Sequence, residues 1–310
     1  MILLFSGGLD SYIAWHILGK PKTVYFDLGT PYSAREIKYI RKLIPGTIID
    51  SSLKLGDMQV QGKSAFLPFR NLFIAMMATK YDREICIAGV RDDKVIDKSE
   101  EAFLAMTKCL SGIDSLPTRI FSPFWGLTKA DIVGNFINHG YGMKEDLLGT
   151  ISCYSGTEPT NYCGRCRCCF RKWNALWVNG IRLPFHDADI RREYYESAQN
   201  EKYDPQRNQH IMLGVLEYES MNSYLVDIDG ILTNETQGHD FISRTPNNGN
   251  IACVNSLYQG NIITLYSSRL EEDREVTVEW MKKHGVKYHM LILGKQYGDV
   301  YIDDKACNHF

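Results

Sequence analysis

Short apolar runs alternate with longer amphipathic segments along the first 140 residues. The apolar runs stand at 1–5, 23–26, 46–50, 84–88 and 119–122, and each has the length of a strand. Between them, the segments 11–18, 34–43, 72–78, 100–110 and 129–139 have the length and composition of helices. Strands that alternate with helices indicate βαβ units. We therefore expect an α/β fold with a parallel, doubly wound sheet covered on both faces.

A second set of apolar runs follows near the C-terminus. Strands are predicted to begin at 224 and at 262 and to span 300–302, a helix is predicted at 272–284, and the stretch 291–295 ends in a lysine. The stretch 181–221 is polar and charged, so it predicts a short helix followed by an exposed linker. We expect two domains, 1–180 and a smaller Rossmann-like domain at 222–310, joined by this linker.

Composition narrows the function classes. The formal net charge of -2 argues against a surface built to bind a nucleic acid backbone, so we expect small-molecule substrates for the N-terminal domain and leave nucleic acid open for the C-terminal one. No apolar run is long enough to span a membrane, and the N-terminus enters a strand without signal-peptide features. A cytoplasmic protein is therefore expected. A homodimer is compatible with these features, and the sequence does not decide it.

The first strand runs into a glycine-rich loop that is typical of phosphate binding. Gly7 and Gly8 let backbone amides approach an anion, the following helix N-terminus adds positive potential, and Ser6 and Ser11 add hydroxyl donors. Asp10 would repel a phosphate unless Mg²⁺ lies between them, which points to a metal-bridged nucleotide. The alternative without a binding role is a tight glycine turn between a strand and a helix. The predicted nucleotide-binding residues are Phe5, Ser6, Gly7, Gly8, Leu9, Asp10 and Ser11.

Five of the nine cysteines lie between 153 and 169. Cys153, Cys163, Cys166 and Cys169 have the spacing that closes a tetrahedral Zn²⁺ site, and four protein ligands make that zinc structural. Reduced cysteines in a core and a zinc ribbon that binds nucleic acid are the alternatives, and Arg165, Arg167 and Arg171 suit the ribbon or an anionic substrate equally. Cys168 is a fifth thiol that could exchange with Cys166 or Cys169.

Further polar residues follow the predicted strands. Arg70 and Asn71 lie at the N-terminus of an apolar helix, and Lys129 is the first residue of another helix. Gly89 follows a strand and precedes several aspartates. Each alone also fits a helix cap or an acidic turn. Because the carboxyl ends of parallel strands meet at one edge of a sheet, we expect these residues to line one nucleotide and substrate pocket with the loop.

These segments resemble a known family. Ser-Gly-Gly-Leu-Asp-Ser at 6–11 is similar to the pyrophosphate loop of the N-type ATP pyrophosphatases. Together with 67–71, 127–132 and the cysteine segment, it resembles the 7-cyano-7-deazaguanine synthase (QueC-type) family over about residues 1–180. The resemblance implies an adenine nucleotide alpha hydrolase-like fold and an ATP-dependent ligase that joins 7-carboxy-7-deazaguanine and ammonia to form the nitrile through adenylated intermediates. ATP and Mg²⁺ would lie at 5–11, and zinc at the four cysteines.

One loop departs from that family. Where the family typically has Gly-Gln-Arg-His, the chain reads Gly29-Thr30-Pro31-Tyr32 before Arg35-Glu36 resume the pattern. An enzyme that stops at the amide, or that joins the deazaguanine to another acceptor, is therefore an alternative. A related ATP pyrophosphatase that modifies tRNA is another; it would need a reactive cysteine, for which Cys86 and Cys109 have too apolar a setting. A nucleotide-binding module without turnover is the non-enzymatic alternative.

The C-terminal domain suggests a second phosphate chemistry. Asp227 and Asp229 follow a strand at positions i and i+2, so both face the same side, where one can attack phosphorus and the other can protonate the leaving group. This pattern resembles the haloacid dehalogenase superfamily of phosphatases. The resemblance implies Asp227 as nucleophile and Asp229 as acid/base. The stretch 234–250 is too short for a cap domain, so we expect an open site. The resemblance also implies phosphate binding by Ser267, Ser268 and Lys295, and Mg²⁺ held by Asp227, Asp229 and Asp303.

Overall fold

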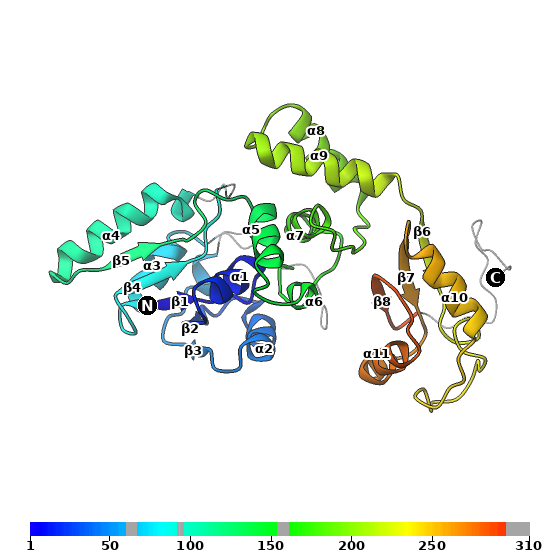
Figure 1. Ribbon diagram of the computed structural model, residues 1–310. Coiled ribbons are helices and arrows are strands. Elements are labelled where there is room, and N and C mark those ends of the chain that lie inside the picture. Colours follow the sequence, from blue (N-terminus) through cyan, green and yellow to red (C-terminus); the bar gives the residue numbers. More distant parts are fainter. Residues whose placement is uncertain (60–66, 92, 94–95, 154–160, 296–310) are drawn as a thin grey trace. The chain divides into compact units, whose positions relative to one another are not determined.

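The computed structural model describes residues 1–59, 67–91, 93, 96–153 and 161–295. These residues form two compact units. Unit 1 contains Met1–Ile181 and Phe185–Val215, and unit 2 contains Arg182–Pro184 and the described residues from Leu216 onward. Each unit has its own sheet, which Figure 1 shows, and each has its own apolar core.

The sheet of unit 1 is parallel throughout, as the apolar pattern predicts. Its strands are β1 (Ile2–Leu4), β2 (Lys22–Phe26), β3 (Ile48–Asp50), β4 (Glu84–Ile87) and β5 (Arg119–Phe121), in the order β3-β2-β1-β4-β5. β1 lies in the centre and pairs with β2 on one side and β4 on the other. The chain order reverses direction at β1, and such a switch point is where ligands bind in open α/β sheets.

Helices cover this sheet on both faces (Figure 1). They are α1 (Leu9–Ile17), α2 (Ser33–Leu43), α3 (Arg70–Ala78), α4 (Glu100–Asp114), α5 (Lys129–Asn138), α6 (Lys144–Leu148) and α7 (Arg167–Trp177), with the 3₁₀ turns η1 (Gly56–Met58) and η2 (Ile96–Lys98). α5 begins at a capping box in which the Thr128 hydroxyl accepts from the Asp131 amide at 3.2 Å. This cap fixes where the helix, and with it Lys129, begins.

The core of unit 1 follows from the alternation of side chains along its strands. Leu4, Val24, Phe26 and Ile85 point to one face and pack with residues of α3 and α4, among them Phe103. Each such fully buried side chain contributes about 1.5–3 kcal/mol through the apolar surface it removes from water. This packing fixes the sheet edge from which the polar loops emerge.

The segment 181–221, predicted as a short helix and a linker, instead contains two helices, α8 (Ala188–Gln199) and α9 (Pro205–Glu219). The Tyr194 ring of α8 stacks on Phe170 of α7 with ring centroids 4.1 Å apart, and the Asn174 amide of α7 donates to the His210 carbonyl at 2.9 Å. Charged residues such as Arg192, Glu193 and Glu196 are exposed, and this surface charge is what suggests a linker in the sequence. Unit 1 therefore extends to Val215.

Unit 2 is a smaller parallel sheet. Its strands β6 (Ser223–Val226), β7 (Ile262–Tyr266) and β8 (Met290–Ile292) lie in the order β6-β7-β8, with the helices α10 (Asn248–Leu257) and α11 (Arg274–Lys283) and the turn η3 (Glu271–Asp273). Trp280 of α11 is fully buried in the core, and its indole N–H donates to the Arg244 carbonyl at 2.8 Å. The strand predicted at 300–302 lies outside the described residues.

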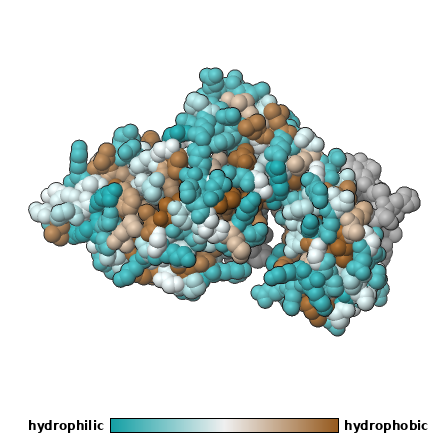
Figure 2. All heavy atoms as spheres, viewed as in Figure 1, coloured by the Kyte–Doolittle hydropathy of each residue, from teal (hydrophilic) through white to brown (hydrophobic). Residues whose placement is uncertain are grey.

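The face of the molecule in Figure 2 is mainly hydrophilic, with hydrophobic residues scattered over it. Across the described ranges, every helix is too short or too polar to span a membrane. Some apolar residues, such as Ile113 on α4, are exposed, as on many protein surfaces.

Candidate functional site

The predicted phosphate loop connects β1 to α1 at the centre of the sheet. Gly7 has a φ of +71°, which glycine adopts without strain, and a Cβ on it would stand 3.0 Å from an Ile40 side-chain carbon of α2. The N-cap residue of α1, Gly8, makes no side-chain cap hydrogen bond, so the first amides of the helix are available to an anion. The Ser11 hydroxyl lies 3.3 Å from that of Ser6. The loop thus presents amide and hydroxyl donors together.

Charged side chains from three other segments meet at this loop. Lys129 of α5 forms an ion pair with Asp10 of α1. Lys98 of η2 has its ammonium 2.7 Å from Asp93 and 4.0 Å from Asp10. Arg171 of α7 pairs with the other oxygen of Asp93. These five residues, called the cation cluster below, carry three positive and two negative charges, a balance that favours an anionic ligand.

Asp93 is the buried centre of the cation cluster. Its side chain is only 3% exposed. Burial alone would raise the pKa of this carboxyl, yet the charges of Lys98, Arg171 and Lys129 hold the pKa of Asp93 well below its usual range. Asp93 therefore stays ionised and holds the lysine and the arginine at the loop.

A cavity of about 440 Å³ opens at the carboxyl ends of β1, β2 and β4. The cation cluster and the phosphate loop line one part of it, and residues of β2, α2 and α3 line another. Beside the loop and the cation cluster, the lining includes Tyr25, Glu36, Arg70, Asn71, Cys153 and Cys168. A cavity of this size holds a small ligand such as a nucleotide.

The structure brings most of the predicted pocket residues to this cavity. Arg70, Asn71 and Lys129 line it. Asn71 also ties down the turn that carries Lys98, because its side-chain amide donates to the Asp97 carbonyl at 3.3 Å. Gly89 acts differently from a lining residue: a Cβ there would come within 2.6 Å of the Trp125 ring, so glycine is needed for this close packing.

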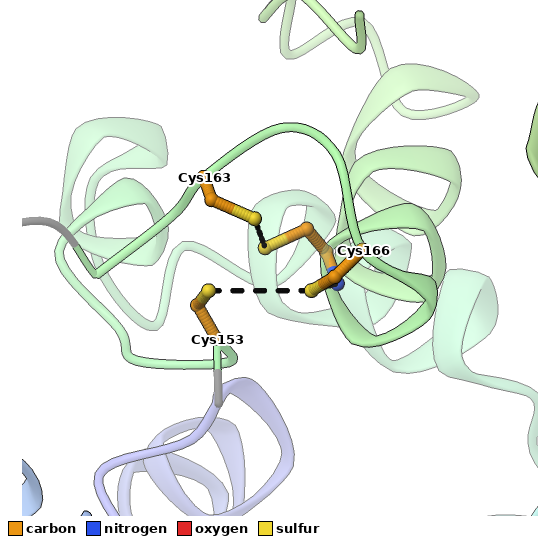
Figure 3. Close-up of side chains that lie close together, drawn as sticks. Cys153, Cys163 and Cys166 are labelled. Carbon is orange, nitrogen blue, oxygen red and sulfur yellow. Dashed lines mark hydrogen bonds between the residues drawn. The ribbon is translucent and has the colours of Figure 1, made fainter. Parts of the chain in front are cut away.

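The four predicted zinc ligands lie together. Their sulfur atoms are all within 4.8 Å of one another, and Figure 3 shows Cys153, Cys163 and Cys166 converging with the fourth thiol. The sulfurs of Cys153 and Cys166 are 4.0 Å apart, and those of Cys163 and Cys169 are 3.8 Å apart. Zinc–sulfur bonds of about 2.3 Å in a tetrahedron require sulfur–sulfur distances of about 3.8 Å. The donor set therefore fits a zinc site with four cysteine ligands.

The cysteine cluster is connected to the phosphate loop through the segment 149–153. The Ile151 amide donates to the Gly7 carbonyl at 2.9 Å, and Arg35 of α2 donates to the Cys153 carbonyl. Lys172 of α7, which is 1% exposed, donates to the carbonyls of Leu148 and Thr150 at 3.1 and 2.6 Å. Formation of the metal site thus fixes one wall of the cavity.

The remaining cysteines of unit 1 differ from one another. Cys168 is not one of the four clustered thiols, but its side chain hydrogen-bonds with Cys166 and lines the cavity, and this contact lowers the pKa of the Cys168 thiol to about 7. Cys86 is buried in β4, and burial raises the pKa of its thiol to about 12, which makes it a poor nucleophile. Cys109, for which the sequence suggests an apolar setting, is instead exposed on α4.

Unit 2 gathers the predicted phosphate-site residues at the carboxyl ends of β6 and β7. The Lys295 ammonium lies 2.7 Å from Asp227, and the Ser267 hydroxyl lies 3.4 Å from Asp229. Ser268 is exposed, and among the described residues it is Ser267, not Ser268, whose hydroxyl reaches a carboxylate of this group. Asp303, the predicted further magnesium ligand, lies outside the described residues.

Two arginines that the sequence analysis does not single out complete this second group. Arg244 donates to Asp229 at 2.6 Å, and Arg269 donates to both oxygens of the same carboxylate at 2.6 and 3.0 Å. Both guanidinium groups are almost fully buried. The one sequence signal for Arg269 is its position directly after the two serines that follow β7.

The fold and the site of unit 1 define an α/β protein whose central cavity is large enough for a nucleotide and whose four clustered cysteines fit a zinc ion. Residues 20–180, more than half of the chain, match the family model described as "Queuosine biosynthesis protein QueC", and the chain belongs to this family. ATP use is implied by this membership.

The chain is also similar, at low sequence identity, to individual curated proteins of the same family. A 7-cyano-7-deazaguanine synthase of Psychromonas ingrahamii is 24% identical over 61% of this chain and 98% of its own length. A second, from Methanothermobacter thermautotrophicus, is 27% identical over 59% of this chain and 96% of its own length. A solved structure from Vibrio cholerae is 27% identical, covers 28% of this chain and 83% of that chain, and has a TM-score of 0.25, too low to support an argument.

Proposed function

We propose that unit 1 is an ATP-dependent ligase that converts 7-carboxy-7-deazaguanine and ammonia into 7-cyano-7-deazaguanine. One observation carries the proposal: the phosphate loop, the cation cluster and Cys153 of the metal cluster line a single cavity in a chain of the QueC family. The assignment of the ligase to the N-terminal part of the chain, and the roles of the individual site residues, are part of the same proposal.

In the proposed reaction, a carboxylate oxygen of the substrate attacks the α-phosphorus of ATP, and pyrophosphate leaves. The amides at the start of α1 and the cations Lys98, Lys129 and Arg171 stabilise the charge on the phosphates. Mg²⁺ would neutralise further phosphate charge when bound at Asp10. Ammonia then displaces AMP to give the amide. A second ATP adenylates the amide oxygen, and loss of AMP and a proton leaves the nitrile.

The loop at 29–32 bears on the extent of this reaction. Thr30 and Tyr32 of this loop line the cavity. An enzyme that stops at the amide, or that transfers the activated deazaguanine to another acceptor, would use the same first adenylation, so the identity of the product distinguishes these alternatives.

The test is mass spectrometry of the purified protein incubated with ATP, Mg²⁺, ammonium and 7-carboxy-7-deazaguanine. We expect AMP and the nitrile from the wild type. We expect none from Asp10→Ala, because this variant lacks the carboxylate that pairs with Lys129. Asp114→Asn, a change in an ion pair with Arg83 outside the cavity lining, serves as the control and is expected to stay active. Amide alone would establish the shorter reaction, and wild type without AMP would reject the ligase.

We propose for unit 2 a magnesium-dependent phosphohydrolase activity of the haloacid dehalogenase type. Its support is the pairing of Lys295 with Asp227 beside Asp229 and Ser267, which brings together a nucleophile, a phosphate-binding cation and a hydroxyl. Bulky phosphates, including nucleotides and polynucleotide ends, are the expected substrates.

This second activity is tested by phosphate release from para-nitrophenyl phosphate, a nucleoside monophosphate and a 3′-phosphorylated oligonucleotide in the presence of Mg²⁺. Asp227→Asn removes the nucleophile and is expected to lower release by at least about 100-fold. Asp240→Asn alters an exposed carboxylate and should leave it unchanged. Equal release by wild type and Asp227→Asn would mean that the activity does not come from this site.

A further inference from the structure

A half-buried carboxylate that the phosphate chemistry does not use faces the same cavity. Glu36 lies in the first turn of α2 and lines the cavity beside Tyr25 of β2. The Tyr25 hydroxyl donates to one oxygen of this carboxylate at 2.5 Å. Within the described ranges, Tyr25 is the one hydrogen-bond donor to Glu36, so its second oxygen is left for a ligand.

The surroundings of Glu36 differ from those of Asp93. Asp93 has two cations in direct contact, whereas the nearby Arg35 donates to the Cys153 carbonyl instead. Burial raises the pKa of Glu36 to about 7, and the Tyr25 hydrogen bond and the charges of Arg70 and Arg35 offset this only in part. The carboxylate is therefore short of donors, and a ligand that brings N–H groups would supply them.

The chemistry of a carboxylate selects among heteroaromatic ligands. Its two oxygens are both acceptors, so they match an edge with two adjacent donors, such as a ring N–H next to an exocyclic amino group. A guanine-type base has this edge. An adenine-type base presents a donor next to an acceptor, and the acceptor nitrogen would face a carboxylate oxygen unfavourably.

We propose that Glu36 determines which base the enzyme accepts, by taking hydrogen bonds from the ring N–H and the exocyclic amino group of a guanine-type substrate. Tyr25 holds the carboxylate in position through its hydroxyl. The cavity then has two ends: the loop and the cation cluster bind phosphate, and the wall formed by β2 and α2 binds the base of the acid. The proposal rests on the proposed ligase function, because the base is part of the acid that is adenylated.

The test compares the acid 7-carboxy-7-deazaguanine with two analogues, one without the exocyclic amino group and one with an adenine-type edge. KM for each acid and for ATP is measured from pyrophosphate release. Wild type should prefer the guanine-type acid over the amino-free one by about 10- to 100-fold, since a buried acceptor loses its donor in the analogue. Glu36→Gln replaces one acceptor with a donor, so it should lose most of this preference and leave KM for ATP within about twofold.

Two further variants separate recognition from folding. Tyr25→Phe removes the hydroxyl that holds the carboxylate, so a smaller rise in KM with the preference retained is expected. Glu84→Gln makes the same chemical change in a surface ion pair with Arg119 and should match wild type. If Glu36→Gln weakens all three acids equally, Glu36 has only a structural role and the proposal is overturned.

Adenine recognition would give a different result. The glutamine amide offers one donor and one acceptor, which suits adenine. If Glu36→Gln keeps the wild-type KM for the acids and for ATP, and Glu36→Ala raises KM for ATP, the proposal is overturned. If wild type releases no pyrophosphate with any acid, the ligase function fails by itself. Calorimetric titration with 7-deazaguanine and 7-deazaadenine then tests base recognition alone. If wild type binds 7-deazaguanine more tightly and Glu36→Gln abolishes this preference, the proposed role of Glu36 is supported. If wild type shows no such preference, the proposal is overturned.

Discussion

Replacement of Cys163 by serine is expected to empty the metal site and to destabilise unit 1. The four sulfurs lie within 4.8 Å of one another, so the remaining three cannot close a tetrahedral site. Structural zinc sites contribute to folding directly, on the order of 10 kcal/mol in isolated zinc modules. That is comparable with the whole stability of a domain, about 5–15 kcal/mol. The zinc content should fall from about one ion per chain to none, and thermal unfolding should begin well below the wild-type transition.

Two other cysteine variants make this prediction specific. Cys168→Ser changes a thiol that lines the cavity outside the cluster, and Cys109→Ser changes an exposed thiol on α4. Both should keep about one zinc per chain, measured by elemental mass spectrometry. Loss of zinc from Cys168→Ser with retention in Cys163→Ser would show that the fifth thiol, and not Cys163, is a ligand.

The metal variant should also affect the phosphate loop. Ile151 donates to the Gly7 carbonyl, and Cys153 is two residues further along the same segment. Without the metal, this segment loses its anchor, so the loop loses a support. Hydrogen exchange at 5–11 and at 149–153 should increase together, whereas exchange in unit 2 should stay as in wild type.

The sequence predicts those features of the site that a single continuous segment forms. The phosphate loop is one strand–turn–helix segment, and its glycines must be where the sequence has them because the turn needs a positive φ at Gly7. The parallel sheet is predictable for the same reason, since each strand is a short apolar run between helices. The cysteine spacing also indicates its metal directly.

The parts that the sequence does not predict depend on distant contacts. Lys98 lies in a polar stretch that resembles many solvated turns. Hydrogen bonds from Asn71 to Asp97 and the ion pair of Lys98 with Asp93 bring this turn to the cavity. Glu36 looks like a helix surface residue until Tyr25 of the neighbouring strand is seen to contact it. The segment that forms α8 and α9 is rich in charged residues, and this composition predicts a linker. The contacts of both helices with α7 are not visible in the sequence.

The largest catalytic effect in the cation cluster is expected from Lys98→Met. The Lys98 ammonium lies between Asp93 and Asp10 and lines the cavity. Its removal deletes one of the three cations that would face the phosphates of ATP and leaves two carboxylates with less compensation. Loss of a preorganised group that stabilises transition-state charge lowers kcat by about 10²–10³-fold. Methionine keeps most of the length of the side chain, so the packing of η2 should be preserved.

A split between kcat and KM separates this role from a structural one. If Lys98 acts on the charge that develops during adenylation, kcat for pyrophosphate release should fall much more than KM for ATP rises. Lys108→Met, a matched change on the exposed face of α4, should leave both unchanged. If Lys98→Met retained the wild-type kcat, stabilisation of the leaving pyrophosphate would belong to Lys129, Arg171 and the loop amides alone. Asp93 would then position Arg171, and its contact with Lys98 would serve the fold.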